Sequence, residues 1–280
     1  MKLMVVLGAG ESGVGTAILA KKKNYRVFVS DKGKIKKKYK NVLEHFEIDW
    51  EEQRHSEDKI LNADVVMKSP GIPDTATLVK KLIAKGIPVI SEIEFAAKYT
   101  NAKIIGITGS NGKTTTTMLT YHILKEGGLN VGMAGNIGES FAKMVAEKDY
   151  DYYVLEISSF QLDGIVDFKP GIAVITNITP DHLDRYEHSF ENYVSSKFRI
   201  VQNHSAQDRL IYDYDDKVIK SWLENNPIKS KLLPFSITNK LGEGAWLEND
   251  KILIRTDNNT LEMEADSLAL EGLHNLKNTM

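Results

Sequence analysis

A glycine-rich stretch in the middle of the chain carries the residues best suited to chemistry. An apolar run at 104–107 leads into Thr108-Gly109-Ser110-Asn111-Gly112-Lys113-Thr114, and a helical pattern continues to about Lys125. In a strand–loop–helix unit of this kind, backbone N–H groups converge on one point, and the helix dipole favours an anion there. Lys113 would reach the outer phosphates of a nucleoside triphosphate, and the Thr114 hydroxyl would ligate Mg²⁺. The sequence therefore predicts a triphosphate site.

The spacing of the glycines in this stretch is irregular. A strict phosphate loop has a glycine five residues before Gly112, where Ile107 stands, whereas Gly109 precedes Gly112 by only three. An ordinary turn capped by Ser110 and Asn111 is the alternative. The order of strand, glycine loop and helix favours the phosphate site over that turn.

A second glycine-rich turn opens the chain. The apolar run Leu3–Leu7 precedes Gly8-Ala9-Gly10-Glu11-Ser12-Gly13, and a helix to about Lys22 and a strand at 26–30 ending at Asp31 follow. This order is the Rossmann fingerprint, in which glycines let the backbone approach a phosphate and an acid about 20 residues on meets a ribose hydroxyl. NAD is one candidate ligand, but glycine-rich turns of this type also hold other nucleotides.

Two further side chains are expected at the same sheet edge as the central loop. Glu156 ends the apolar strand 151–155, and His182 follows the strand 171–176. Because the carboxyl ends of parallel strands meet at one edge of a sheet, these two residues and Lys113 should converge. A carboxylate there can organise Mg²⁺, and a neutral imidazole can ligate a metal, although a loop histidine is more often a surface residue.

The remaining pattern indicates the fold class. The other expected elements are a helix at 49–61, a strand at 64–67, a helix at 189–201, and strands at 209–212, 231–235, 245–247, 251–255 and 260–263. Ser69-Pro70-Gly71 is a rigid turn after a strand, at the edge where ligands bind in open α/β sheets. The lysine-rich run Lys32–Lys40 is typical of a solvated loop. For Lys197, in the expected helix at 189–201, the residues alone indicate an ordinary solvated lysine. We expect an α/β protein with a Rossmann-like N-terminal domain at 1–92 and a P-loop-type central domain at 93–280 that includes a small additional β portion.

Composition and charge are those of an ordinary soluble globular protein. Apolar residues make up 42% and charged residues 26% of the 280 residues, and the formal net charge is −2. This charge gives no reason to expect a nucleic-acid or membrane partner, and no apolar run approaches the roughly 18 residues of a membrane span. The lack of cysteine excludes disulfides, zinc thiolates and a thiol nucleophile, and it is compatible with a cytoplasmic protein.

Together, these motifs resemble those of the Mur ligase family, and within it the members that add D-glutamate. The resemblance spans the whole chain and is carried by Gly8-x-Gly10-x-x-Gly13, Ser69-Pro70-Gly71-Ile72, the loop at 108–114, Gly135-Asn136-Ile137-Gly138, the runs 155–162 and 177–186, Tyr193-x-x-x-Lys197-x-Arg199-Ile200 and Gly272-x-His274-Asn275-x-x-Asn278. The Ser-Pro-Gly turn and the Ser-Ser-Phe-Gln-Leu run at 158–162 favour the D-glutamate-adding members over relatives that add alanine, a diamino acid or a dipeptide.

The resemblance implies an ATP-dependent ligation in two steps. The carboxylate of UDP-N-acetylmuramoyl-L-alanine would attack the γ-phosphate of ATP, and the amine of D-glutamate would then displace phosphate from the acyl phosphate, a cytoplasmic step of peptidoglycan synthesis. The implied ATP contacts are Gly109, Ser110, Asn111, Gly112, Lys113, Thr114 and Thr115, with Asn275 and Asn278 on the adenine side. The implied contacts of the UDP-sugar are Gly10, Glu11, Ser12, Asp31, Ser69, Gly71, Asn136, Ser158 and His182. Glu11 departs from the small residue that these members often have there.

The implied catalytic residues are Lys113, Glu156, His182 and Lys197. The last three would join Thr114 in holding two Mg²⁺ ions, with Lys197 carbamylated by CO₂. A carbamate replaces a cation by an anion with two oxygens, so it can ligate a second Mg²⁺. Two ions on the γ-phosphate would offset the repulsion felt by an attacking carboxylate.

The family also has a third domain, which carries most amino-acid contacts. Residues 272–280 look like the opening of a helix at the point where that domain should begin. We therefore expect a monomeric fragment that binds its ligands but does not turn over. The alternatives are another amino-acid-adding Mur ligase, a folylpolyglutamate synthetase-like ligase, which should lack the turn at Gly8–Gly13, a non-enzymatic nucleotide-binding module, and an NAD-dependent oxidoreductase, which leaves Lys113 unexplained.

Overall fold

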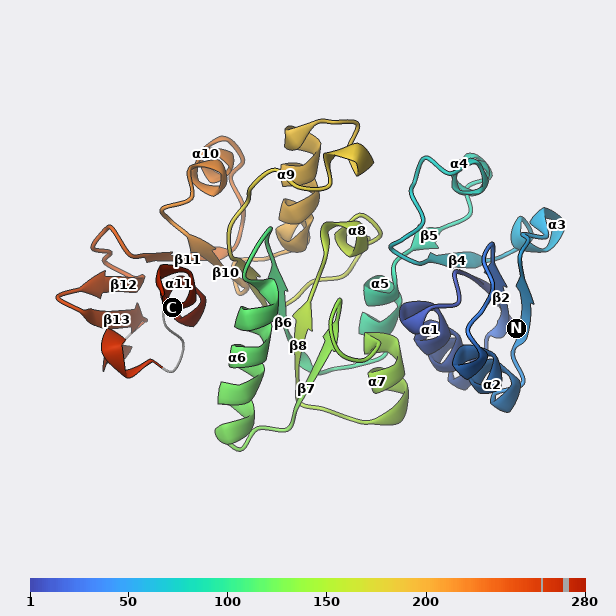
Figure 1. Cartoon of the computed structure of the whole chain (residues 1–280), viewed down its shortest axis with the longest axis horizontal. Coiled ribbons are helices and arrows are strands. Elements are labelled where there is room, and N and C mark those ends of the chain that lie inside the picture. Colours follow the sequence, from blue (N-terminus) through green and yellow to red (C-terminus); the bar gives the residue numbers. More distant parts are fainter. Residues whose placement is uncertain (258, 269–271) are drawn as a thin grey trace. The chain divides into compact units, whose positions relative to one another are not determined.

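The computed structural model describes residues 1–257, 259–268 and 272–280, which form two compact units (Figure 1). The first unit comprises residues 1–102, 134–150 and 160–168, and the second comprises residues 103–133, 151–159 and 169–280. The units thus alternate along the chain. The division into consecutive domains at 1–92 and 93–280 stays a prediction.

A five-stranded parallel sheet forms the centre of the first unit. Its strands are β1 (Leu3–Leu7), β2 (Arg26–Asp31), β3 (Asp49–Glu52), β4 (Val65–Lys68) and β5 (Val89–Ile90), in the order β3-β2-β1-β4-β5. The helices of this unit are α1 (Glu11–Lys22), α2 (Lys37–His45), α3 (Glu57–Ile60), α4 (Thr77–Ala84), α5 (Glu92–Ala97) and α7 (Phe141–Glu147). The chain passes from β1 through the glycine turn into α1, as the sequence predicts.

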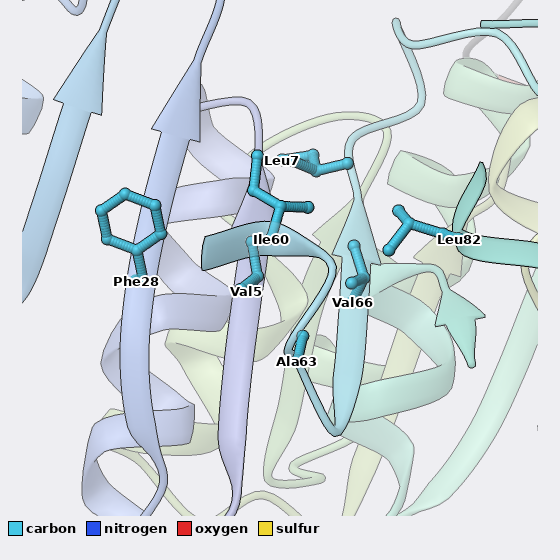
Figure 2. Close-up of a cluster of buried hydrophobic side chains, with 7 residues drawn as sticks. All are labelled: Val5, Leu7, Phe28, Ile60, Ala63, Val66 and Leu82. Carbon is cyan, nitrogen blue, oxygen red and sulfur yellow. The ribbon is translucent and has the colours of Figure 1, made fainter. Parts of the chain in front are cut away.

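A cluster of buried side chains holds this sheet together (Figure 2). Val5 and Leu7 of β1 pack with Phe28 of β2 and Val66 of β4, and Leu82 of α4 belongs to the same cluster. Parallel strands that are covered on both faces need a nearly continuous apolar sequence, and Met4 to Leu7 of β1 are indeed all buried. Strand β1 therefore gives the glycine turn at its carboxyl end a rigid base.

A mixed nine-stranded sheet forms the second unit. Its strands are β6 (Lys103–Thr108), β7 (Val131–Gly135), β8 (Tyr152–Glu156), β9 (Ile172–Ile175), β10 (Arg209–Asp213), β11 (Lys231–Ser236), β12 (Gly244–Glu248), β13 (Lys251–Thr256) and β14 (Asn259–Glu264), in the order β14-β13-β12-β11-β10-β9-β6-β8-β7. The strands from β8 to β12 in this order pair in parallel, and β13 and β14 add antiparallel hairpins. The helices of this unit are α6 (Lys113–Glu126), α9 (Phe190–Phe198), α10 (Lys217–Asn225) and α11 (Leu273–Thr279), whereas α8 (Ser159–Leu162) has only its first residue in this unit and otherwise belongs to the first unit. The predicted α/β class, with a small β portion, is confirmed.

The predicted helix at 49–61 is wrong. Asp49–Glu52 is strand β3, which pairs in parallel with β2, and only Glu57–Ile60 is helical. The pairing of Phe28 with Asp49 is non-local, so a local helical pattern does not reveal it.

Two other helices differ from the sequence-based expectation. The lysine run was expected to be a loop, but its last residues begin α2, which buries Leu43. Helix α10 was not predicted, although Asp216 accepts hydrogen bonds from the Val218 and Ile219 N–H groups. An aspartate in that position is a standard helix-start signal. In the described part of the chain, no helix is long and apolar enough to cross a membrane.

Candidate active site

The central loop between β6 and α6 adopts a conformation that requires glycine. Gly109 and Gly112 have φ angles of 144° and 81°, values that other residues rarely adopt. A Cβ atom on Gly109 would lie 2.0 Å from the Thr176 hydroxyl, and one on Gly112 would lie 2.4 Å from Oδ1 of Asn278. The irregular glycine spacing therefore corresponds to a defined loop geometry.

The segment that follows β9 holds the loop in place. The Asn111 N–H donates to Oδ1 of Asn177 at 3.0 Å, and Nδ2 of Asn177 donates back to the Asn111 carbonyl at 2.9 Å. The Thr176 hydroxyl donates to the same carbonyl at 2.6 Å. The Ser110 hydroxyl donates to the Thr179 carbonyl and accepts from the Thr179 N–H, both at 2.9 Å. None of these three partners was predicted, although their place after a parallel strand was a usable signal.

Two lysines converge on one carbonyl oxygen of the loop. Nζ of Lys113 donates to the carbonyls of Gly109 and Ser110, each at 2.9 Å, and Nζ of Lys197 donates to the Gly109 carbonyl at 2.7 Å. Burial lowers the pKa of Lys113, and the charges of Glu156 and Asp181 partly oppose that effect. Two adjacent ammonium groups beside a glycine loop form a strongly anion-attracting site.

Lys197 is buried, so its interpretation as a solvated lysine is wrong. The residue is only 2% exposed, and Nζ lies 4.7 Å from the centre of the Tyr193 ring. The Tyr193 hydroxyl is in turn 3.0 Å from the Ser110 hydroxyl. Helix α9 thus delivers both a cation and an aromatic ring to the phosphate loop.

Glu156 lies at the end of β8, next to the loop strand β6, as the sequence predicts. The carboxylate is buried, and Oε2 accepts a hydrogen bond from the Thr114 hydroxyl at 2.7 Å. A carboxylate and a hydroxyl are oxygen ligands that suit Mg²⁺, which usually keeps several waters and binds few protein groups. The residues present therefore fit one magnesium ion.

His182 lies in an exposed loop of the second unit. It has a left-handed φ of 49°, its side chain is 55% exposed, and Nε2 lies 3.4 Å from Oδ2 of Asp181. Within the described residues, no group of three or more histidine, aspartate and glutamate side chains is arranged to hold a metal ion. The metal-ligand role of His182 stays a prediction.

A cavity of about 370 Å³ adjoins the phosphate loop. Its lining includes Thr115, Thr116, Ile211, Phe235, Asn275 and Asn278. The Thr116 hydroxyl is 3.4 Å from Oδ1 of Asn278, and Nδ2 of Asn278 is 3.4 Å from Oδ1 of Asn275. Helix α11 packs against α6 (Figure 1), so both predicted adenine-side asparagines reach a pocket that continues from the triphosphate site.

The glycine turn of the first unit is also tightly built. Gly8 has a φ of 92°, and a Cβ atom there would lie 2.6 Å from the Ser69 hydroxyl. One carboxylate oxygen of Asp31 accepts from the Ala9 N–H and the other from the Gly33 N–H, both at 2.7 Å. Gly10 begins α1 without a side-chain cap, so the first turn of the helix can bind an anion.

Other predicted substrate contacts differ in their surroundings. Glu11 accepts a hydrogen bond from the Tyr39 hydroxyl at 2.9 Å, whereas the Ser12 side chain bonds to the buried Glu92. Gly71 and Asp31 line a cavity of about 750 Å³ in the first unit. Asn136 is exposed after β7 in the first unit, and Ser158 is half-buried after β8 in the second. The roles of these two residues toward the sugar stay predictions.

The fold and the two glycine loops define a nucleotide-binding α/β protein with a phosphate loop of the P-loop type. The chain belongs to the Mur ligase family: residues 107–280 match the Mur ligase middle domain, and residues 4–77 match the MurD N-terminal domain.

Curated relatives extend this assignment. The chain is 61% identical to the UDP-N-acetylmuramoylalanine–D-glutamate ligase of Christiangramia forsetii over 279 residues and 55% identical to that of Bacteroides fragilis over 280 residues. The ligase of the same name from Chlorobaculum tepidum is 37% identical over 294 aligned positions. Each alignment covers the whole chain, and the chain spans 63% of the length of each relative.

Solved structures share the fold. The UDP-N-acetylmuramate:L-alanyl-γ-D-glutamyl-meso-diaminopimelate ligase from Neisseria meningitides aligns with a TM-score of 0.65 and 20% identity, covering 99% of this chain and 90% of that one. UDP-N-acetylmuramate–alanine ligase from Thermotoga maritima aligns with a TM-score of 0.56 and 20% identity, covering 99% and 63%. At this identity the likeness concerns the fold alone.

Proposed function

We propose that this chain provides the UDP-substrate site and the ATP site of a ligase that joins D-glutamate to UDP-N-acetylmuramoyl-L-alanine in peptidoglycan synthesis. The observation that carries the proposal is the convergence of Lys113 and Lys197 on the Gly109 carbonyl, in a chain 61% identical to a ligase of that name. The acceptor and the amino acid are taken from the names of the relatives.

The loop supplies the charge that phosphoryl transfer needs. The L-alanyl carboxylate attacks the γ-phosphate of ATP, which forms an acyl phosphate and releases ADP. The D-glutamate amine then attacks the acyl carbon, expels phosphate and leaves an amide. Both reactants of the first step are anions, so positioned cations lower its barrier. To take part, the Lys113 ammonium must exchange the carbonyls of Gly109 and Ser110 for phosphate oxygens.

Thr114 and Glu156 would hold one Mg²⁺. When bound, this ion would neutralise negative charge on the phosphate oxygens. A second ion would need Lys197 as a carbamate, together with His182. For that, the Lys197 amine must leave the Gly109 carbonyl and lose a proton before CO₂ can add to it. The Tyr193 ring already holds the side chain of Lys197 beside the loop.

The first unit would bind the UDP end of the substrate rather than NAD. The uncapped start of α1 at Gly10 suits the diphosphate, and Asp31 suits the ribose. The match of residues 4–77 to the MurD N-terminal domain favours this ligand over a nicotinamide cofactor. We further propose that the 280 residues act as a monomer. We also propose that they bind both ligands without completing the reaction, since they span only 63% of the length of the relative from Christiangramia forsetii.

Calorimetric titration of the 280-residue chain tests the proposal. We expect saturable binding of UDP-N-acetylmuramoyl-L-alanine, UDP and Mg·ATP, weak or no binding of NAD, and no ADP release when D-glutamate is added. Binding of NAD without binding of the UDP compounds would overturn the substrate assignment. ADP release that depends on both substrates would contradict only the proposed lack of turnover.

A further inference from the structure

The cavity beside the glycine turn of the first unit is lined partly by a residue, His55, that belongs to none of the motifs. It opens at the carboxyl ends of β1, β2 and β3, and its lining includes Asp31, Lys32, His55, Gly71, Ile72 and Pro73. Ile72 and Pro73 offer an apolar surface for a flat ring, whereas His55 offers a polar atom. His55 lies just after β3, in the segment that the sequence pattern assigned wrongly to a helix.

A chain of short hydrogen bonds fixes the proton on His55. Oε1 of the buried Glu51 accepts from the Ser30 hydroxyl at 2.7 Å, and the same hydroxyl oxygen lies 2.7 Å from Nδ1 of His55. Burial works to raise the pKa of Glu51, but hydrogen bonds from Ser56 and Ser30 and the Arg54 charge hold it below its ordinary value. Glu51 is therefore ionised at neutral pH and can only accept.

The Ser30 hydroxyl has a single hydrogen, and it goes to the Glu51 carboxylate at 2.7 Å rather than to the Arg54 carbonyl, which lies farther away at 3.4 Å. Ser30 must accept a hydrogen bond from the His55 ring, so the ring proton is on Nδ1. Burial lowers the pKa of His55, an effect that exceeds the opposing charges of Glu51 and Asp31, so the ring is neutral. Ser30 is the ring's one hydrogen-bond partner within the described residues. Nε2 then carries a lone pair and acts as an acceptor.

We propose that His55 selects the base of the bound nucleotide by accepting the N3–H of uracil at Nε2. This inference rests on the proposed function, which brings a UDP-sugar to the first unit. Uracil in a nucleotide has one N–H group, at N3, whereas cytosine has a lone pair there. An acceptor fixed at Nε2 can therefore bond to N3–H of uracil. With cytosine, the lone pair of Nε2 would face the lone pair of N3, which is repulsive. Asp31 also lines this cavity, but its two carboxylate oxygens already accept hydrogen bonds from the Ala9 and Gly33 N–H groups.

Competition between UDP and CDP for the 280-residue chain tests this role. The parent chain should prefer UDP, because a site built to hydrogen-bond one partner rejects an analogue that lacks the group. In His55→Phe the ratio of the two affinities should fall by roughly tenfold, mainly through weaker UDP binding. In Ser30→Ala the ring is free to take the other tautomer, so CDP should gain relative to UDP. His45→Phe makes the same substitution at an exposed histidine of α2 and should leave the ratio unchanged.

A measurement on the unmutated chain covers the case in which His55→Phe does not fold. The ¹⁵N shifts of the His55 ring should show a protonated Nδ1 and an unprotonated Nε2, and the Nε2 signal should move when UDP is added but not when CDP is added. A proton on Nε2, or an equal loss of UDP and CDP affinity in His55→Phe, would overturn the inference while leaving the proposed function intact. Failure of the parent chain to bind UDP would instead overturn both.

Discussion

The ammonium group of Lys277 lies 2.7 Å from the carboxylate of Asp213, and this ion pair joins α11 to the end of β10. The Asp213 side chain is 4% exposed and that of Lys277 is 26% exposed. Asn275 and Asn278 lie on the same short helix, beside the phosphate loop. The pair therefore holds the nucleoside-side residues in position, and Lys277 itself also lines the cavity beside the loop.

Replacing Lys277 should weaken the binding of the nucleoside but not of the phosphates. Lys277→Met leaves the Asp213 carboxylate buried without its cation. Burial already raises the pKa of Asp213, and loss of the Lys277 charge and hydrogen bond raises it further. We expect roughly fivefold to tenfold weaker ATP binding, corresponding to about 1 kcal/mol, with tripolyphosphate binding unchanged. Calorimetry with both ligands makes the comparison.

Lys80→Met, at an exposed lysine of α4, is the matched control and should affect neither ligand. Asp213→Asn combined with Lys277→Met should cost less than the sum of the single changes, because the two groups interact directly. A parallel loss of ATP and tripolyphosphate affinity would mean that Lys277 acts on the loop as a whole.

Gly112 and Gly128 allow the loop contact to be separated from backbone strain. Both have a left-handed φ, 81° and 79°, but a Cβ atom on Gly112 meets Oδ1 of Asn278 at 2.4 Å, whereas one on Gly128 meets nothing within 4 Å. Gly112→Ala and Gly128→Ala should each lower the free energy of unfolding by about 1 kcal/mol. Only Gly112→Ala should also weaken ATP binding, by roughly tenfold or more, because it displaces Asn278. Similar ATP affinities in the two variants would contradict this.

The sheet edge of the site could be predicted from the sequence because it depends on strand order alone. The apolar runs that end in Thr108, Glu156 and Thr176 form the parallel strands β6, β8 and β9, respectively. Strand β6 lies between the other two, so the carboxyl ends of all three meet. Each run is short, apolar and bounded by polar residues, a pattern that is consistent with a buried parallel strand.

Side-chain direction could not be predicted in the same way. Nothing in the order of residues indicates that Lys113 folds back onto Gly109, or that His182 takes a left-handed backbone beside Asp181. Strand β3 was missed because its partner, β2, is distant in sequence, and His55 was missed with it. These features depend on tertiary contacts, which override local propensity.

Glu11 gives a prediction about substrate affinity. It lies in the first turn of α1, where the diphosphate is expected, and its carboxylate is held by the Tyr39 hydroxyl at 2.9 Å and by Lys38 at 4.0 Å. Glu11→Gln removes a negative charge from the neighbourhood of an anion, so UDP should bind about twofold to fivefold more tightly at low salt. Glu44→Gln, at an exposed position of α2, is the control and should have little effect. A gain that persists unchanged in high salt would show that charge is not its cause.

Asp215 should make the stability of the second unit depend on pH. Burial works to raise its pKa, but hydrogen bonds from Ser236, Thr238, the Ile237 N–H and Asn239 lower it to about 2. Because the folded pKa lies below the unfolded value of about 3.9, this contribution is fully present above pH 4 and is lost as the pH falls toward 2. Asp215→Asn should lower the free energy of unfolding by about 1–2 kcal/mol at pH 6, after allowance for solvent screening.

Urea unfolding in a Trp50→Phe background measures this effect, because the remaining tryptophans, Trp222 and Trp246, both belong to the second unit. The difference between the parent and Asp215→Asn should shrink between pH 4 and pH 2, since protonation gives the parent carboxyl the neutral charge of the variant. Asp266→Asn, at an exposed site of the same unit, should change the free energy of unfolding by no more than about 0.5 kcal/mol at any pH. A difference that stays constant down to pH 2 would mean that Asp215 stabilises the unit through the shape of its hydrogen-bond network and not through its charge.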